Sequence, residues 1–167
     1  MTIRAEQGTS QDREAIRVIH EAAFGRRDEA DLVDSLRAEG AVLLGLVAES
    51  ECGVVGHLLF TRMWIQTGHS SLEAVALAPV AVLPRHQKQG IGTRLISEGL
   101  SRLRSEGERI VIVLGHPEYY TRFGFSVEKA ATLQSPFPPE AFMANELEPG
   151  ALDGVSGAVR YPAAFEL

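Results

Sequence analysis

The stretch Leu77-Ala-Pro-Val-Ala-Val-Leu-Pro-Arg-His-Gln-Lys-Gln-Gly-Ile-Gly-Thr-Arg-Leu95 decides the fold. Its apolar start predicts a buried strand, a polar loop follows, and apolar residues at helical spacing then predict a helix. The first turn of a helix carries unpaired N–H groups and a partial positive charge. Gly90 and Gly92 remove the side chains that would keep a phosphate from this backbone. The sequence therefore predicts a phosphate-holding loop.

Length and composition narrow the class of protein. A chain of 167 residues with 45% hydrophobic and 23% charged residues fits one globular domain over residues 1–167. No apolar run approaches the ~20 residues of a membrane span, and Met1–Glu6 lacks the apolar region of a signal peptide. Because Cys52 is the only cysteine, an intrachain disulfide is excluded and a cytoplasmic location is expected.

The chain as a whole is acidic, whereas the residues around the loop are basic. The formal net charge of −6 argues against nucleic acid as a partner, because nucleic-acid binding needs a basic face. Arg85, His86, Lys88 and Arg94 nevertheless surround the loop with positive charge. Such a cluster is often only solvated surface, but beside a glycine loop at a helix start it favours anion binding. We expect no metal.

Hydrophobic periodicity predicts a mixed α/β protein. The predicted elements, in order, are a strand over Thr2–Gln7, helices from Thr9 to Gly25 and over Asp28–Glu39, strands over Val42–Glu49, Val54–Gln66 and Leu72–Leu83, a helix over Gly90–Glu106, a strand over Ile110–Leu114, a short helix over Glu118–Phe123, and strands near Ala141–Leu147 and Gly157–Tyr161. Strand, helix and strand from Leu72 to Leu114 indicate a parallel crossover. Phe24 and Arg27, at the bend between the first two helices, are candidates to line a substrate entrance; packing for Phe24 and surface for Arg27 are equally good interpretations.

Pro79 interrupts the strand that leads into the loop. Proline has no N–H to donate, so a central strand that contains one must bulge or lose a neighbour there. We therefore expect the sheet to open near Pro79–Val82, where backbone groups could pair with a ligand.

Two nucleotide-binding motifs do not fit this loop. A mononucleotide P-loop needs Gly-x-x-x-x-Gly-Lys-Ser/Thr, which is absent. A dinucleotide fingerprint needs a third glycine, whereas Thr93-Arg94-Leu95 follows Gly92. Nucleotide binding by this loop thus stays an alternative hypothesis without a matching motif.

The motif Gln87-x-x-Gly90-x-Gly92 after an interrupted apolar strand resembles motif A of the GCN5-related N-acetyltransferases (GNAT). The predicted order of elements is similar to the order in that family. Tyr120-Thr-Arg-Phe-Gly124-Phe125 matches the family pattern Tyr-x-x-x-Gly-Phe. Leu77–Pro84, Val113–Tyr120 and Gly157–Phe165 resemble the YhbS-like branch, so the resemblance covers essentially the whole chain.

The resemblance implies a mixed α/β GNAT fold. Its order is a strand, two helices, three antiparallel strands, a helix, a strand, a short helix and two last strands, and the strands over Leu72–Leu83 and Ile110–Leu114 splay apart. It implies an N-acetyltransferase with acetyl-CoA as co-substrate and a primary amine as acceptor. Backbone groups of Val80, Ala81 and Val82 would meet the pantetheine arm and the thioester. The residues that would cradle the pyrophosphate are Gln87, Lys88, Gln89, Gly90, Ile91, Gly92 and Thr93, with Lys88 and Arg94 near the nucleotide phosphates.

Acetyl transfer to an amine needs proton transfers at both ends. Deprotonating an amine of pKa ~10.4 at pH 7 costs roughly 4.6 kcal/mol, so a base or water must take the proton. The departing thiolate needs an acid, and a phenol of pKa ~10 stays protonated at pH 7. Tyr120 is the candidate acid, which the resemblance places beside the sulfur, and Tyr119 is its rival. The base stays open among His57, Glu73, His116, Glu118 and solvent.

The main alternative is a non-catalytic acyl-CoA-binding or regulatory module on the same fold. Thiol release from acetyl-CoA separates the two hypotheses, because only an enzyme breaks the thioester. The sequence leaves open the acceptor, which is a small molecule or a protein, the acyl-chain preference, and whether the protein is a homodimer.

Overall fold

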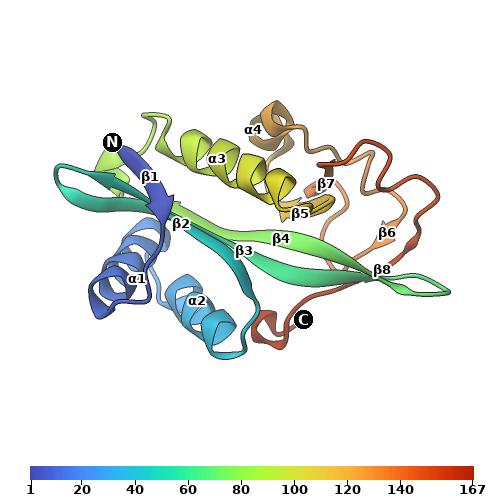
Figure 1. Cartoon of the computed structure of the whole chain (residues 1–167), viewed down its shortest axis with the longest axis horizontal. Helices are drawn as coiled ribbons and strands as arrows, with labels where there is room; N and C mark the ends of the chain where they lie inside the picture. The colour runs from blue at the N-terminus through green and yellow to red at the C-terminus, as the bar shows by residue number, and fades with distance from the viewer. The chain divides into compact units, whose positions relative to one another are not determined.

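The predicted strands belong to one mixed sheet in the computed structural model, which describes residues 1–167. The elements are β1 (Thr2–Ala5), α1 (Ser10–Phe24), α2 (Asp28–Ala38), β2 (Val42–Ser50), β3 (Gly53–Gln66), β4 (Ser71–Val82), α3 (Ile91–Ser105), β5 (Ile110–Leu114), α4 (Pro117–Tyr120), β6 (Leu133–Gln134), β7 (Phe142–Glu146) and β8 (Gly157–Arg160) (Figure 1). The strand order is β1-β2-β3-β4-β5-β7, and β8 pairs with β3 and β6. The predicted α/β class and order are confirmed, and the two-residue β6 is an addition.

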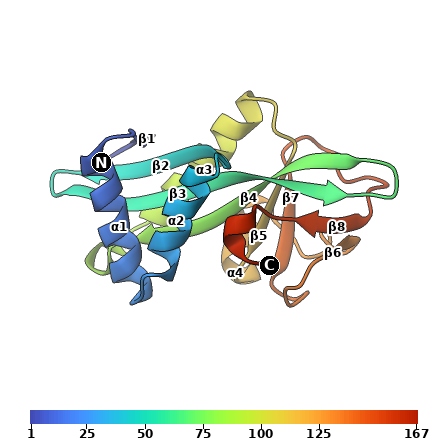
Figure 2. The ribbon, with the colours of Figure 1, turned by 90° about the horizontal axis from the view of Figure 1, so that it is seen from below.

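The chain forms two compact units, and the first comprises residues 1–61 and 78–99. Here α1 and α2 pack against each other (Figures 1 and 2). The Thr9 hydroxyl accepts the Asp12 N–H at the start of α1, and Gly25 ends the helix with φ 69°. Successive side chains of β3 point to opposite faces. His57 accordingly contacts His20 of α1, whereas a Cβ at Gly56 would contact Ile91 and Leu95 of α3.

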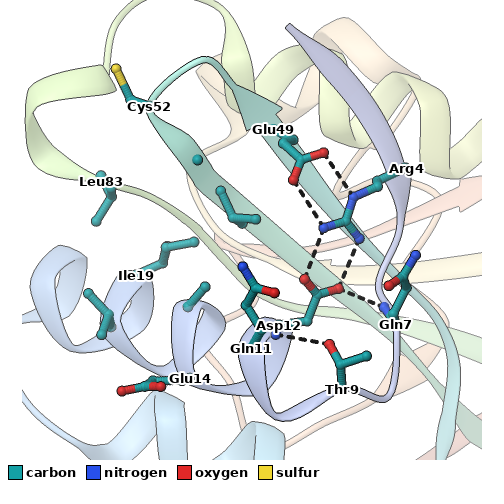
Figure 3. A pocket seen from close by; sticks show the side chains of 14 residues that line it. Arg4, Gln7, Thr9, Gln11, Asp12, Glu14, Ile19, Glu49, Cys52 and Leu83 are labelled. Atoms are coloured by element: carbon teal, nitrogen blue, oxygen red, sulfur yellow. Dashed lines mark hydrogen bonds and ion pairs between the residues drawn. The ribbon is translucent and has the colours of Figure 1, made fainter.

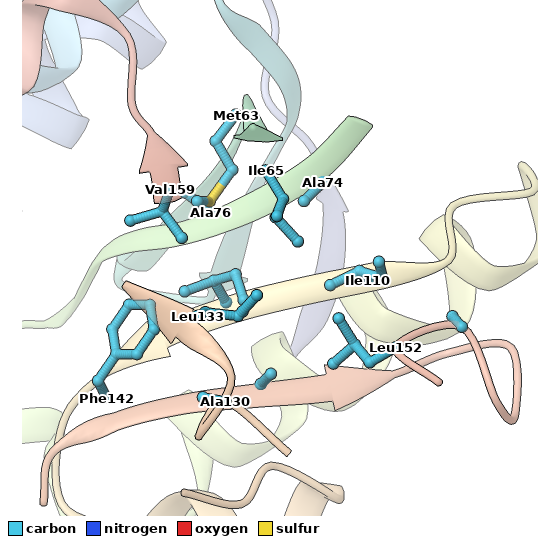
Figure 4. Close-up of a cluster of buried hydrophobic side chains, with 13 residues drawn as sticks. Met63, Ile65, Ala74, Ala76, Ile110, Ala130, Leu133, Phe142, Leu152 and Val159 are labelled. Atoms are coloured by element: carbon cyan, nitrogen blue, oxygen red, sulfur yellow. The ribbon is translucent and has the colours of Figure 1, made fainter. Parts of the chain in front are cut away.

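The second unit comprises residues 62–77 and 100–167. Its β5 pairs antiparallel with β7, from Ile110 opposite Glu146 to Leu114 opposite Phe142. The end of β3 pairs antiparallel with β8, which lies beside β6 (Figure 2). The residues Ile110–Val113 of β5 are buried, as expected for an apolar central strand, whereas Leu114 at its end is exposed. Side chains from these strands build one core, which includes Met63, Ile65, Ala76, Ile110, Ile112, Phe142 and Val159 (Figure 4).

The parallel pair β4 and β5 opens as Pro79 predicts. Pairing joins Val75 to Val111 and Ala76 to Ile112, and it stops there although β4 continues to Val82. Pro79, which follows a cis peptide bond, lies beyond the last pair. The splayed strands expected from the sequence are therefore confirmed. That the two units act as one domain stays a prediction. None of the helices combines the length and the apolar character needed to cross a membrane.

Candidate active site

The loop between β4 and α3 has the backbone of an anion site. Lys88 and Gly90 are left-handed, with φ 63° and 82°, and such residues are typical of concave nests of N–H groups. The carbonyl of Gly90 accepts the Arg94 N–H at 3.0 Å, so α3 starts immediately after Gly90. The first turn of α3 contains no acidic residue, and the positive end of the helix dipole there favours a negative ligand.

Two glutamine side chains brace this loop from within. Gln87 donates from Nε2 to the Val82 carbonyl at 2.9 Å, and Gln89 donates to the Arg85 carbonyl at 3.4 Å. The Leu83 N–H in turn donates to the Val55 carbonyl at 2.9 Å. The side chain of Gln87 thus ties the loop to the end of β4. These hydrogen bonds hold the loop, although the Gln87 side chain remains exposed.

The predicted loop residues differ in what they can offer a ligand. Gln87, Lys88, Gln89, Gly90 and Arg94 are exposed, Gly92, Thr93, Val80 and Val82 are half-buried, and Ala81 and Ile91 are buried. The side chains of Ala81 and Ile91 belong to the core. Any contact they make with a ligand is restricted to their backbone. Arg94 and Lys88 supply the accessible positive charge.

Phe24 and Arg27 lie at the end of α1 and just before α2 in the first unit. Phe24 is 41% exposed, which is unusual for a large apolar side chain. The Arg27 side chain is 77% exposed and reaches Asp31 only at 4.0 Å. Both side chains are accessible, as a substrate entrance requires. Their role there stays a prediction.

Tyr120 lies in the second unit at the end of α4, inside a cluster of rings. Its ring packs edge-on against buried Phe125 at a centroid distance of 5.8 Å and against Tyr119 at 5.0 Å. Burial, with a smaller contribution from Tyr119, raises the pKa of Tyr120 to about 12. The phenol therefore keeps its proton at neutral pH, as a general acid must.

None of the candidate bases is held in a way that singles it out. Glu73 is exposed and forms an ion pair with Arg62 at 3.1 Å. His116 and Glu118 are exposed before and within α4. Ala76, on the central strand, is buried in the core of the second unit and has no carboxylate.

A buried polar network in the first unit was not predicted from the sequence. His20 and His57 are both fully buried, and their rings are joined by a 2.8 Å hydrogen bond from Nε2 of His20 to Nδ1 of His57 or the reverse. His57 Nε2 lies 3.4 Å from a Glu6 oxygen, and Arg37 pairs with Glu6. Among these four residues, the sequence indicates only His57, as a candidate base. The only signal for its partner is that His20 occupies the apolar stripe of α1.

An open hollow of about 760 Å³ lies between α1 and the β2–β3 turn (Figure 3). Its only cation, Arg4, binds both oxygens of Asp12 at 2.9 Å and also contacts Glu49. Because two carboxylates already neutralise Arg4, the hollow lacks the charge that would hold a phosphate. Leu83 borders it, but the predicted loop residues, Phe24 and Arg27 do not line it.

Comparison with known proteins identifies the family. Residues 4–127 match the model of the acetyltransferase (GNAT) domain, which covers the loop, α3, β5 and Tyr120. The chain belongs to the GNAT family. It is therefore an enzyme of the acetyltransferase class, and the resemblance in motif A and in Tyr-x-x-x-Gly-Phe is confirmed at the level of the family.

Relatives within the GNAT family place the chain in the YhbS-like branch. It is 37% identical over 146 residues to the uncharacterized N-acetyltransferase YhbS of Escherichia coli (strain K12), with 86% of each chain covered. A crystal structure of E. coli YhbS in complex with CoA is similar at a TM-score of 0.89 and 34% identity, covering 99% of this chain and 92% of that one. A GNAT acetyltransferase from Brucella melitensis in complex with acetyl-CoA is similar at a TM-score of 0.81 and 38% identity, with 98% and 97% covered.

Proposed function

We propose that this GNAT protein transfers the acetyl group of acetyl-CoA to a primary amine by direct attack, with Tyr120 as the general acid. The observation that carries the proposal is the β4–α3 loop. There, left-handed Lys88 and Gly90 open a basic nest at the start of a helix with no acid in its first turn. Two relatives above 30% identity were crystallised with CoA or acetyl-CoA, which supports the same ligand here.

In this proposal different groups of the protein bind the pyrophosphate, the pantetheine arm and the thioester of acetyl-CoA. The backbone from Lys88 to Thr93 holds the pyrophosphate, and Lys88 and Arg94 neutralise it. Gln87, whose N–H already donates to the Pro84 carbonyl at 3.3 Å, holds the loop in shape. Backbone groups of Val80, Ala81 and Val82 pair with the pantetheine arm where β4 has left β5. An oxyanion needs a hydrogen-bond donor, so the N–H of Val82 is the group proposed to stabilise it; the Val82 carbonyl accepts from Gln87.

The proposed step balances as follows. The neutral amine nitrogen attacks the thioester carbon, and the carbonyl electrons move onto oxygen. As the oxyanion collapses, the carbon–sulfur bond breaks and the thiolate takes the proton of the Tyr120 phenol. The nitrogen loses one proton to solvent, and a proton from solvent restores the phenol. The products are an N-acetyl amine and CoA with a free thiol.

The test measures free-thiol release from acetyl-CoA over a panel of amines: spermidine, kanamycin, free lysine, and peptides with a free N-terminus or a lysine. At least one amine should accelerate thiol release. If none does, while acetyl-CoA still binds, the protein is a non-catalytic acyl-CoA-binding module.

Tyr120→Phe and Tyr119→Phe, assayed with the fastest amine of that panel, test the choice of acid. Tyr120→Phe should lower kcat by roughly 10²-fold, as expected for loss of a general acid. It should leave the Kd for acetyl-CoA unchanged, and Tyr119→Phe should keep wild-type kcat. Unchanged kcat for Tyr120→Phe would remove the assignment.

A further inference from the structure

The residue that brings Tyr120 to its position is Gly115, directly after β5. A Cβ on Gly115 would lie 2.4 Å from Cε2 of Tyr120, 2.8 Å from Cδ2 and 3.4 Å from Cζ. The first two distances are shorter than any real contact of a Cβ. The three nearest atoms all belong to the Tyr120 ring. The missing side chain of Gly115 therefore makes room for this ring.

The backbone on both sides of this contact is held in place. The Gly115 N–H donates to the Ala141 carbonyl at 3.0 Å, just before β7. The Tyr120 N–H donates to the His116 carbonyl at 3.1 Å, which folds α4 back toward the end of β5. Neither segment can withdraw without breaking a backbone hydrogen bond.

The ring is also enclosed on its other sides. Phe125, Tyr119 and Phe123 surround it at centroid distances of 5.8, 5.0 and 6.3 Å. Asn145, buried on β7, donates to the Phe123 carbonyl at 2.9 Å and holds the turn that carries these rings. The ring of a tyrosine is placed by only two side-chain torsions, so a fixed ring also fixes the position of its hydroxyl oxygen. That hydroxyl makes no hydrogen bond with another part of the chain.

We infer that Gly115 is a positioning residue: because it has no side chain, the Tyr120 ring can lie against its backbone, and this contact sets where the Tyr120 hydroxyl points during acetyl transfer. The inference rests on the proposed function, because it needs Tyr120 to act as the acid. A general acid must come within about 2.6–3.2 Å of the atom it protonates, and a displacement of ~1 Å can cost about 10²-fold in rate. A methyl group at residue 115 would displace the ring by such an amount.

The test is a cycle of Gly115→Ala, Tyr120→Phe and the double variant, assayed with acetyl-CoA and the fastest amine of the panel. Gly115 is not left-handed, so Gly115→Ala adds no strain of that kind, and the three atoms nearest to its Cβ would be those of the Tyr120 ring. Gly68→Ala is the matched control, because its Cβ would meet nothing within 4 Å. Gly115→Ala should lower kcat at least tenfold with the Kd for acetyl-CoA within twofold. In the Tyr120→Phe background it should change kcat by less than twofold.

The outcomes separate the inference from the proposed function. The inference alone is wrong if Tyr120→Phe lowers kcat but Gly115→Ala does not. It is also wrong if Gly115→Ala lowers kcat by the same factor in the Tyr120→Phe background as in the wild type. If Tyr120→Phe keeps wild-type kcat, or no amine reacts, both are wrong. Should Gly115→Ala fail to fold, Phe125→Leu removes the ring that packs edge-on against Tyr120 and must show the same split between kcat and Kd. Wild-type kcat in that variant overturns the inference.

Discussion

At the scale of single residues, two adjacent tyrosines on α4 have different environments. Arg122 lies over the Tyr119 ring at 4.5 Å and donates from Nε to the Tyr119 carbonyl. The Tyr120 ring lies against Gly115 and Phe125, and its burial raises the pKa of the phenol to about 12. Adjacent positions on a helix point in different directions. The sequence could name both tyrosines, but their surroundings depend on the fold.

The buried pair His20 and His57 makes the stability of the chain sensitive to acid. Burial, and then the charge of His57 and Arg37, lower the pKa of His20 to about 3. Burial also lowers the pKa of His57. The hydrogen bond and charge of Glu6 oppose this shift, the charge of Arg37 adds to it, and the charge of Asp12 opposes it. A histidine with a folded pKa below its unfolded value of ~6.5 binds fewer protons in the folded state. Its contribution to stability is complete above pH 6.5 and is lost as the pH falls toward 3.

We therefore expect the free energy of unfolding to fall between pH 7 and pH 5. The contribution from His20 is about 2 kcal/mol, since 1.5 pH units below 6.5 at 1.36 kcal/mol each oppose folding. Urea unfolding at several pH values measures this slope. His20→Gln should be less stable than wild type at pH 7 but should show a flatter slope.

The control for this prediction is His69→Gln. His69 is exposed in the turn before β4, so its removal should keep the wild-type slope. A His20→Gln protein with an unchanged slope between pH 7 and pH 5 would show that the buried pair does not cause the acid sensitivity.

At the scale of elements, the two ends of α3 provide a matched pair of glycines. Gly90 precedes the helix with φ 82°, and Gly107 follows it with φ 89°. A Cβ at either position would meet nothing within 4 Å. Replacement of either by alanine thus costs the same strain of about 1–2 kcal/mol, but only Gly90 lies in the proposed phosphate loop.

We expect Gly90→Ala to weaken acetyl-CoA binding at least tenfold, because its Cβ would keep the pyrophosphate from the N–H groups. Gly107→Ala should lose a similar amount of thermal stability and keep wild-type affinity. Isothermal titration calorimetry measures the affinities, and thermal unfolding checks that the two variants are equally strained. Equal affinity in both would argue against the loop as the phosphate site.

The elements themselves were largely predictable because their signals are local. Hydrophobic periodicity, caps such as Thr9 and stops such as Gly25 give each helix from neighbouring residues alone. The strand β6 was not predicted, because two residues carry no periodicity and Leu133–Gln134 is a strand only through its parallel pairing with β8. The network of Glu6, His20, Arg37 and His57 joins α1, α2, β3 and the segment after β1, so no local pattern indicates it.

At the scale of the whole molecule, binding of acetyl-CoA should raise the free energy of unfolding. A ligand that binds only the folded state at 100 times its Kd adds about 2.7 kcal/mol, which for a chain of this length is roughly 5–10 °C in Tm. CoA should protect to a similar extent, since it has the same pyrophosphate and pantetheine arm. Thermal unfolding with CoA, acetyl-CoA, ATP and NAD measures this, and protection by ATP or NAD alone would contradict the acyl-CoA assignment.

The sequence by itself determined the order of the main elements, the GNAT resemblance and the loop from Gln87 to Thr93. Each of these rests on residues close together in the chain: glycines for the backbone, Pro79 for the opening of the strand, and apolar residues for the faces. Only the tertiary structure decided that Gln87 braces Val82, that His20 meets His57, and that Gly115 makes space for Tyr120. Such contacts join residues that are distant in the chain or on different elements. They depend on the path of the backbone between those elements, which local sequence patterns do not predict.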